Sequence, residues 1–415
     1  MSSVSKSSAY PDTVQPGIPK LSDQPPHGWK RTTFGDHLYE EKRPVKMDDS
    51  TEYDLVTVKR ARGGVVKRER KLGADISVKT QFEVKDGDFL ISKRQIVHGA
   101  CGIVPPQLDG STVSNEYAVL RGKNSIDLKF LKHFSHSVFF QQTCFHSSIG
   151  VHIEKMIFKT DKWFGWEFDL PSVDEQRRIA EILSTWDRAI ETTEKLIANS
   201  QAQKKALMQQ LLTGKKRLPG FDGEWVEYRL DQLAVVTMGS SPKSENYNVN
   251  GLGLPLLQGN ADIVDGRSSP RVFTSEITQT CEPGDILLSV RAPVGSIALS
   301  DHHACVGRGL ASIRAKSSTS SLLLLERLRH AQNIWQRFSQ GSTFEAVNSK
   351  DVRSLKLTLP SNSKEQEVLG KMLSSAQREI EDQGKMLGTL REEKAALMQQ
   401  LLTGKRRVKT EEAAA

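Results

Sequence analysis

Apolar residues recur at alternating steps of four and three along two stretches of the chain. The first stretch comprises Ile179, Leu183, Trp186, Ile190, Thr193, Ile197, Ser200, Lys204, Leu207 and Leu211, of which seven are apolar. The second comprises Leu369, Leu373, Ala376, Ile380, Gln383, Leu387, Leu390, Lys394, Leu397 and Leu401, of which eight are apolar. A 3.5-residue apolar period sustained over several heptads is typical of coiled coils. The pattern therefore predicts two long helices that bury their apolar seams against each other.

The two predicted helices are copies of one unit. The decapeptide ALMQQLLTGK occupies residues 206–215 and again residues 396–405, an offset of 190 positions. The same offset relates Glu175-Gln176 to Glu365-Gln366, and two polar positions of the seam coincide, Thr193 with Gln383 and Lys204 with Lys394. A fixed period of this kind indicates a duplicated architecture. The chain is thus predicted to contain two variable blocks, each followed by a near-constant helix.

Both ends of each helix carry termination signals. Ser172 and Asn362 stand three residues before a glutamate, the spacing of a capping box. Gly214 and Gly404 follow the last apolar residue, where glycine favours a helix end. Each helix then has about 38 residues, or roughly 57 Å at 1.5 Å per residue. The alternative, a pair of ordinary core helices in one large domain, agrees less well with this length and unbroken register.

The blocks before the helices mix strands with shorter helices. In the first, residues 51–59, 88–93 and 117–120 have strand patterns, and residues 127–140 have helical spacing. In the second, the strand that follows Gly284-Asp285 parallels the one after Gly87-Asp88, and residues 322–338 have a helical pattern. The fold class is therefore α+β. The predicted organisation is a disordered leader (1–27), block one (28–169), helix one (170–215), block two (216–358), helix two (359–407) and a tail (408–415).

Connection order constrains how these parts assemble. Helix one ends where block two begins, so the two seams meet only if helix two runs back antiparallel. This arrangement relates the two halves of one chain by an approximate two-fold axis. Two-fold DNA readers bind half-sites about one helical turn, roughly 34 Å, or a multiple of it apart. Because the two blocks differ in sequence, the site they would read need not be palindromic.

Composition is that of a soluble, intracellular, moderately basic protein. The chain has 415 residues, 37% hydrophobic and 26% charged, with a net charge of +8. No apolar run is long enough to span a bilayer and no signal pattern is present, so we expect a cytoplasmic protein. Four scattered cysteines show no metal-ligand or redox spacing and are expected to be buried, reduced thiols. The positive charge favours a polyanionic partner.

Motifs for catalysis are missing from the sequence. No glycine-rich loop ends in Gly-Lys-Ser/Thr, and no Asn-Pro-Pro-aromatic tetrad of an amino-methyltransferase occurs. Pro11-Asp12 with Glu40-Glu41-Lys42 resembles a nuclease metal site only weakly, since Pro11-Asp12 lies in the predicted leader. His302-His303 has no carboxylate or thiol at ligand spacing. We therefore expect a non-catalytic chain with no metal site.

Nucleic-acid binding is better supported. Seven cations surround Gly63-Gly64 between residues 59 and 71, where the glycines would allow close approach to phosphates. Arg60, Arg62 or Arg68 would suit bidentate contacts to guanine. The candidate DNA-binding residues are Lys59, Arg60, Arg62, Lys67, Arg68, Arg70, Lys71, Lys93, Arg94, Ser241, Lys243, Arg267, Arg271 and Arg291. The alternative is an ordinary solvated run of charge.

The combined pattern resembles the specificity (S) subunit of type I restriction-modification systems. The helix entries Leu170-Pro171-Ser172…Glu175-Gln176 and Leu359-Pro360-Ser361…Glu365-Gln366, with the Leu-Leu-Thr-Gly-Lys exits, carry the resemblance over residues 28–407. Supporting stretches are Thr237–Pro242, Gly284–Leu287 and Gly341–Phe344. One departure is Trp163-Phe164-Gly165-Trp166, which ends block one where block two has Gly-Ser-Thr.

This resemblance implies a function and a set of partners. Each block would be a target recognition domain that reads one half of a split site in double-stranded DNA. The helices would set the spacing and hold two methyltransferase (M) subunits, which two restriction/translocase (R) subunits join. S-adenosylmethionine, ATP and magnesium would then belong to partner subunits, with no cofactor in this chain. A coiled-coil scaffold without sequence-specific DNA binding, or a self-contained nuclease or methyltransferase, are the rival hypotheses.

Overall fold

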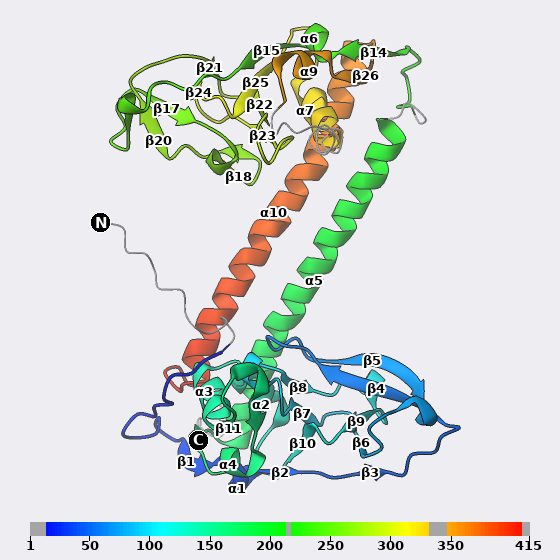
Figure 1. Ribbon diagram of the computed structural model, residues 1–415, viewed down its shortest axis with the longest axis vertical. Helices are drawn as coiled ribbons and strands as arrows, with labels where there is room; N and C mark the ends of the chain where they lie inside the picture. The colour runs from blue at the N-terminus through cyan, green and yellow to red at the C-terminus, as the bar shows by residue number, and fades with distance from the viewer. Residues whose placement is uncertain (1–13, 213–216, 332–346, 409–415) are drawn as a thin grey trace, which may run out of the picture. The chain divides into compact units, whose positions relative to one another are not determined.

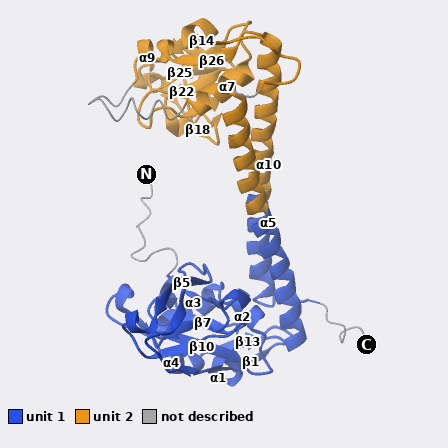
Figure 2. Ribbon diagram, turned by 90° about the vertical axis from the view of Figure 1, so that its right-hand side faces the viewer, with its two compact units in different colours: residues 1–192, 387–415 blue, residues 193–386 orange. Residues whose placement is uncertain are grey.

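The computed structural model describes residues 14–212, 217–331 and 347–408, which divide into two compact units. Unit 1 contains residues 1–192 and 387–415, and unit 2 contains residues 193–386 (Figure 2). Several sequence predictions lie outside the described residues: Pro11-Asp12, the cap at Gly214, the end of the 322–338 helix, the turn at residues 341–344 and nearly all of the 408–415 tail.

The two predicted long helices are present. They are α5 (Val173–Leu211) and α10 (Ser363–Leu401), of 39 residues each (Figure 1). Every one of the predicted seam positions is buried or half-buried, which confirms the heptad interpretation. Unit 1 combines the beginning of α5 with the end of α10, and unit 2 combines the beginning of α10 with the end of α5.

Contacts within each unit show that the helices run antiparallel. In unit 1, Asp187 pairs with Lys394, and the earlier Glu175 pairs with the later Arg407. In unit 2, Lys204 lies 2.8 Å from Gln377, and Arg217 beyond α5 pairs with Glu365. Moving forward along α5 therefore means moving backward along α10 in both units. The antiparallel helix pair and the α+β class predicted from the sequence are confirmed.

Unit 1 contains two main sheets. One has the order β2 (Leu38–Glu40), β10 (Tyr117–Gly122), β7 (Phe89–Ser92), β8 (Cys101–Ile103). The other has the order β3 (Pro44–Val45), β6 (Gln81–Glu83), β9 (Thr112–Ser114), β4 (Glu52–Val58), β5 (Val65–Leu72). Two-stranded sheets join β1 (Lys30–Thr33) to β13 (Glu167–Leu170) and β11 (Ser148–Ile149) to β12 (Ile157–Phe158). The short helices are α1 (Phe34–His37), α2 (Leu128–Phe134), α3 (Val138–His146) and α4 (Thr160–Phe164).

Unit 2 repeats much of this plan. One sheet has the order β15 (Ala234–Met238), β25 (Leu310–Ala315), β22 (Ile286–Ser289), β23 (Ile297–Leu299), β19 (Arg267–Ser268), β18 (Ile263–Val264). The other has the order β16 (Tyr247–Asn248), β20 (Val272–Thr274), β17 (Leu254–Leu257), β24 (Ala304–Val306), β21 (Thr280–Cys281). A two-stranded sheet joins β14 (Trp225–Arg229) to β26 (Lys356–Pro360). The short helices are α6 (Leu230–Leu233), α7 (Ser321–His330) and α9 (Ser349–Ser354).

The topologies correspond strand by strand. The four strands β2-β10-β7-β8 match β15-β25-β22-β23, all antiparallel. The order β5-β4-β9-β6, with β4 and β9 parallel, matches β20-β17-β24-β21, with β17 and β24 parallel. This correspondence confirms that the two blocks are related, as the matched Gly-Asp strands predict.

The Gly-Asp pairs begin buried strands for a shared physical reason. Gly87 and Gly284 adopt φ values of +80° and +90°, a left-handed conformation that favours glycine. The following Asp88 is fully buried and binds Arg43 at 2.7 Å, and Asp285 binds Arg314 through two hydrogen bonds. Although burial opposes its charge, the bonds from Arg314 keep the pKa of Asp285 below its ordinary value.

Domain helices pack onto the helix pair through the repeated glutamines. Gln176 accepts from the backbone N of Asp127 at 2.8 Å, and Gln366 accepts from Ser320 at 3.1 Å. Asp127 and Ser320 are the N-caps of α2 and α7, so each glutamine fixes the beginning of one domain helix. Trp163 is fully buried in a cluster with Leu183 of α5.

Of the predicted leader, residues 14–27 are described, and within unit 1 Val14 is buried and Pro26 lies against the turn at Gly404. One prediction needs correction. The predicted capping boxes are only half formed. The side chains of Ser172 and Asn362 each accept a hydrogen bond from the helix backbone. The side chains of Glu175 and Glu365 bind arginines instead, because charge-assisted bidentate hydrogen bonds are stronger than one bond from a backbone N–H.

Candidate nucleic-acid interface

In unit 1, three loops at strand ends meet to form the first loop cluster, defined as residues 59–64, 93–95 and 115–116. The backbone N of Lys93 donates to Glu116 at 2.8 Å, and Arg94 forms a two-pronged ion pair with the same glutamate. Arg60 donates to Gln95 at 2.6 Å and to Glu154 at 2.8 Å. The loops that follow β4 and β7 are thereby held side by side, with their cations at one surface.

The predicted basic loop is shorter than expected. Residues 65–72 form strand β5, so only residues 59–64 are a loop. Lys67 and Arg70 both bind Asp54 on the neighbouring strand β4, at 2.8 and 2.6 Å. Arg68 and Lys71 each lie 3.1 Å from Glu69. The sequence suggested one run of cations around Gly63-Gly64, whereas the hairpin supplies an acidic partner for each of these four.

The guanidinium of Arg62 is not freely exposed at this surface. It is half-buried with φ +61°, and its side chain packs against Gly99. Its Nε atom is buried without a hydrogen-bond partner, and burial lowers the pKa of its guanidinium. By contrast, Lys59 is exposed and makes no side-chain hydrogen bond or ion pair within the described residues. Of these two predicted contacts, Lys59 is the one available to a phosphate.

In unit 2, four loops form the second loop cluster, defined as residues 239–243, 258–260, 290–293 and 307–309. Backbone bonds from Gly309 to Gln258 (3.1 Å) and from Val290 to Gly309 (3.0 Å) join three of them. The backbone N of Arg308 donates to Ser241 Oγ at 3.1 Å, which adds the fourth. A Cβ atom on Gly309 would lie 2.2 Å from the Gln258 oxygen, so this close approach requires glycine.

Two arginines of the second cluster have free side chains. Arg291 and Arg308 are exposed, and neither makes a side-chain hydrogen bond or ion pair in the part of the chain that the structure describes. Arg308 was not among the predicted residues. Its only sequence signal is its position between Gly307 and Gly309 in the turn that joins β24 to β25.

A groove of about 620 Å³ adjoins these loops. It is lined by Gln258, Asn260, Arg271 and Pro293, among others. Arg271 binds the buried Asp262 at 2.9 Å, and the side chains of Gln258 and Asn260 make no hydrogen bond with other described residues. Side-chain amides of this kind pair with adenine edges. Neither Gln258 nor Asn260 was predicted from the sequence, because isolated amides carry no pattern.

The remaining predicted residues form ion pairs that are exposed or half-buried. Lys93 lies 3.1 Å from Glu40, Arg267 lies 2.5 Å from Asp301, and Lys243 lies 3.9 Å from Glu245. Exposed pairs contribute about 0–1 kcal/mol, so exchanging the carboxylate for a phosphate costs little. The predicted DNA-binding set stays a prediction, and its residues are divided between the two units.

The two clusters occupy equivalent places in the two topologies. Residues 59–64 follow β4 as residues 258–260 follow β17, and residues 93–95 follow β7 as residues 290–293 follow β22. The β9–β10 turn carries Glu116, whereas the equivalent β24–β25 turn carries Arg308. One scaffold therefore presents two surfaces of different chemistry.

Metal-binding side chains do not gather elsewhere in the described part of the chain. No group of three or more His, Cys, Asp or Glu side chains there could hold a metal ion. The four cysteines are buried and unpaired, as the sequence predicted. Among the same residues, no helix combines the length and apolarity needed to cross a membrane.

Comparisons with known proteins agree with this architecture. The family model for the type I restriction modification DNA specificity domain matches twice, at residues 39–199 and 222–386. A curated relative from Methanocaldococcus jannaschii, named as the type I restriction enzyme MjaX specificity subunit, is 32% identical over 253 residues, covering 58% of this chain and 59% of that protein. The alignment thus spans about three-fifths of the relative's length.

Solved structures are similar over most of the chain. One, from work on the structural basis of complex assembly and conformational transition of the type I R-M system, has a TM-score of 0.53 and 27% identity, covering 92% of this chain and 99% of that one. Another, the type I restriction-modification system S subunit from M. genitalium, has a TM-score of 0.65 at 15% identity, covering 93% and 99%, and supports the fold alone.

The fold and its two loop clusters define a protein with two related domains on one duplicated scaffold. The chain belongs to the type I restriction modification DNA specificity domain family, of which it carries two copies.

Proposed function

We propose that the chain is the DNA-specificity subunit of a type I restriction-modification complex and reads a bipartite, asymmetric site. One observation carries the proposal: topologically equivalent loop clusters carry different side chains in the two units. Lys59, Arg60 and Arg94 belong to one cluster, and Ser241, Arg291 and Arg308 to the other. Two surfaces built on one plan but chemically different suit two different half-sites.

The side chains divide by role. Exposed lysines such as Lys59 suit phosphates, which position the protein on the duplex without reading sequence. Arg291 and Arg308 suit guanine edges, because a guanidinium matches the O6 and N7 acceptors in a bidentate fork. Gln258 and Asn260 suit adenine edges. The glycines around them let the backbone come close to the duplex.

The repeated helices suit repeated partners. ALMQQLLTGK ends both α5 and α10, and several of its polar side chains, including Gln209 and Gln399, are exposed. A surface that occurs twice with the same sequence fits two copies of one protein, which we assign to two methyltransferase subunits. Two restriction subunits would join the full complex. As the family resemblance implies, S-adenosylmethionine, ATP and magnesium are assigned to these partners, which is consistent with a sequence that lacks the loops and tetrads that would hold or use them.

Selection from a pool of randomised duplexes tests this proposal. The full chain, alone and with methyltransferase subunits of the same system, is incubated with the pool at several salt concentrations, and the bound duplexes are sequenced. We expect enrichment of one motif with two unequal halves and a fixed gap. Binding with no preference above the salt-dependent background would contradict the proposal and favour the scaffold alternative.

The rival hypotheses have less support. A coiled-coil scaffold without DNA reading does not explain a family match to a DNA specificity domain in both blocks. A self-contained nuclease or methyltransferase predicts turnover by the purified chain alone. Cleavage or methylation of DNA by this chain without partners would contradict the non-catalytic assignment.

A further inference from the structure

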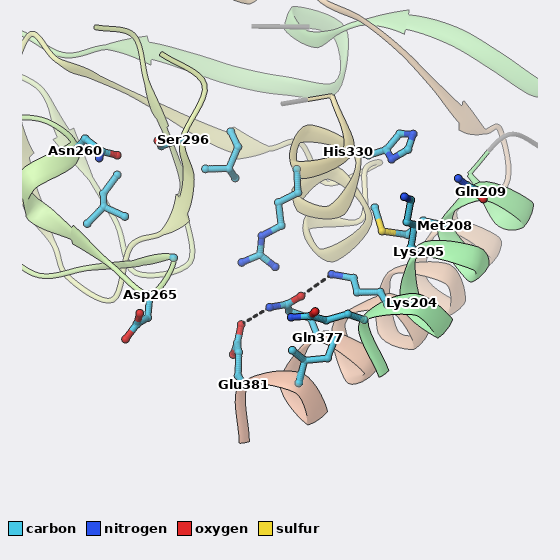
Figure 3. Close-up of a pocket in the computed structure, with 16 residues that line it drawn as sticks. Lys204, Lys205, Met208, Gln209, Asn260, Asp265, Ser296, His330, Gln377 and Glu381 are labelled. Carbon is cyan, nitrogen blue, oxygen red and sulfur yellow. Dashed lines mark hydrogen bonds between the residues drawn. The ribbon is translucent and has the colours of Figure 1, made fainter. Parts of the chain in front are cut away.

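A buried lysine joins three elements in unit 2. Lys204 of α5 occupies a polar position of the seam, and its Nζ atom lies 2.7 Å from Glu326 on α7. The same atom donates to Gln377 of α10 at 2.8 Å (Figure 3). The Glu326 side chain is fully buried, and its other oxygen accepts from Arg329 at 2.8 Å.

The surroundings of this contact place it at the joint between the domain and the helix pair. A cavity of about 720 Å³ beside it is lined by Lys204, Arg329, Gln377 and Glu381, and Gln377 also donates to Glu381 at 2.9 Å (Figure 3). A Cβ atom on Gly370 would lie 2.7 Å from the backbone N of Leu323, so α10 and the beginning of α7 are in close contact. The Lys204–Glu326 pair therefore links recognition domain and helices directly.

Unit 1 has the same lysine but a different acid. Lys394 of α10 corresponds to Lys204 and pairs with Asp187 of α5. Asp187 corresponds to Gln377, since both relations have the offset of 190. On the domain helix α2, the place of Glu326 is taken by His133, six residues after the N-cap in each case. His133 is buried, with Nε2 3.1 Å from Ser184 Oγ and Nδ1 3.9 Å from Asp187.

The acid that neutralises the lysine thus comes from the domain in unit 2 and from the helix pair in unit 1. We propose that these positions encode which recognition domain fits which end of the helix pair. Block two carries Glu326 on its domain helix and is matched by Gln377 on α10. Block one carries His133 on its domain helix and is matched by Asp187 on α5. Block one placed in the second position would leave Lys204 without an acid. This inference is independent of what the domains bind.

Point substitutions in the full chain test the code without exchanging domains. Glu326→His gives unit 2 the domain residue of unit 1 but leaves Gln377 in place. An uncompensated buried lysine is expected to raise the opening equilibrium of α7, measured by amide hydrogen exchange, by about 100- to 1,000-fold. Adding Gln377→Asp supplies the acid where unit 1 has it, and we expect protection within about tenfold of the parent.

The mirror experiment in unit 1 is the matched control. Asp187→Gln alone should loosen α2 and the end of α10, and Asp187→Gln with His133→Glu should restore them. Hydrogen exchange is measured separately in peptides from each unit, so an effect of the substitutions in one unit on the other unit is also detected. Failure of Gln377→Asp to rescue Glu326→His, or an unperturbed Glu326→His protein, would overturn the proposal.

A further variant covers the case in which Glu326→His does not fold. Lys204→Met with Glu326→Leu replaces the buried pair by apolar side chains of similar size, which typically preserves folding. Because this background has no lysine to neutralise, adding Gln377→Asp to it should change protection differently from the same substitution in the parent. If Gln377→Asp changes protection equally in both backgrounds, position 377 does not act through Lys204 and the code is wrong.

Discussion

Arg407 binds the carboxylate of Glu175 through two hydrogen bonds of 2.7 Å each. The same contact recurs in the repeat, where Arg217 (190 positions before Arg407) binds Glu365 (190 positions after Glu175) at 2.9 and 2.7 Å. In each unit, the residues after one long helix therefore hold the first turn of the other. The contact also explains the unusual caps, because both glutamates leave their capping boxes to make it.

Removing this arginine should destabilise unit 1. In Arg407→Ala, the Glu175 side chain, 1% exposed, loses its ion-pair partner. We expect a loss of roughly 2 kcal/mol in the free energy of unfolding, less than for a fully buried pair because Arg407 is 38% exposed. Urea denaturation followed by tryptophan fluorescence measures the change.

The control for this prediction is Lys371→Ala. Lys371 forms an exposed pair with Glu367 one turn earlier in α10, and its loss should cost less than about 0.5 kcal/mol. Equal effects of the two substitutions would show that the Arg407 contact is no more than a surface pair.

Acid should weaken unit 1 through two histidines. Burial, together with neighbouring cations and against the opposing effect of Asp187, lowers the pKa of His133 to about 4 and that of His136 to about 3. Because these folded-state pKa values lie below the unfolded value of about 6.5, protonation favours the unfolded state. Stability is therefore fully present above pH 6.5 and is lost as the pH falls toward 4, by on the order of 2 kcal/mol per histidine at pH 5.

Hydrogen exchange at pH 7.5 and pH 5 checks this, with rates corrected for intrinsic pH dependence. Protection in α2 should fall more than in α7, where the equivalent positions hold Glu326 and Arg329. A His133→Gln/His136→Gln protein should lose much of the difference. Equal acid sensitivity of α2 and α7 in the parent would contradict the assignment.

Features that follow from periodic patterns could be predicted from the sequence, whereas contacts between distant parts of the chain could not. Heptads and the 190-residue offset sufficed for the antiparallel helices, and the Gly-Asp pairs sufficed for matched strands. The burial of Arg62 depends on left-handed backbone at Ala61 and Arg62, which no local pattern indicates. The partner of Lys204 lies 122 residues later, and an isolated glutamate in a helical pattern looks like any solvated charge. Arg308 was missed because one arginine between glycines has no periodicity.

Substitutions in the second loop cluster should affect one half-site only. If Arg308 binds a guanine edge, Arg308→Ala should relax preference at one base pair by about 1–3 kcal/mol, and the other half should keep its preference. Arg308→Lys retains the charge but not the fork, so it should recover affinity more than selectivity. Sequenced selections with the parent and both variants provide the measurement. Equal loss at both halves would mean that Arg308 contributes charge and not sequence readout.

Lys59 in the first loop cluster should behave differently. If Lys59 contacts a phosphate, Lys59→Ala should weaken binding to all duplexes alike. The slope of the logarithm of the binding constant against the logarithm of the salt concentration should decrease in magnitude by about 0.9. Titrations of one preferred and one unrelated duplex between low and moderate salt measure both effects. A loss confined to the preferred duplex would assign Lys59 to base recognition.

Lengthening both long helices should change the gap between the two half-sites, if the helices set it. Seven residues inserted after Thr192 in α5 and seven after Gly388 in α10 preserve the heptad register and add about 10.5 Å to each helix. At 3.4 Å per base pair, the preferred gap should grow by about three base pairs. The inserted heptads carry apolar residues at the seam positions, so that the helix pair stays buried.

As a control, four residues inserted in α5 alone should break the register and lower stability, because the seam then no longer matches α10. Selection from a duplex pool with variable gaps gives the result directly, and an unchanged gap in a stably folded double-insertion protein would show that the helices do not set the spacing.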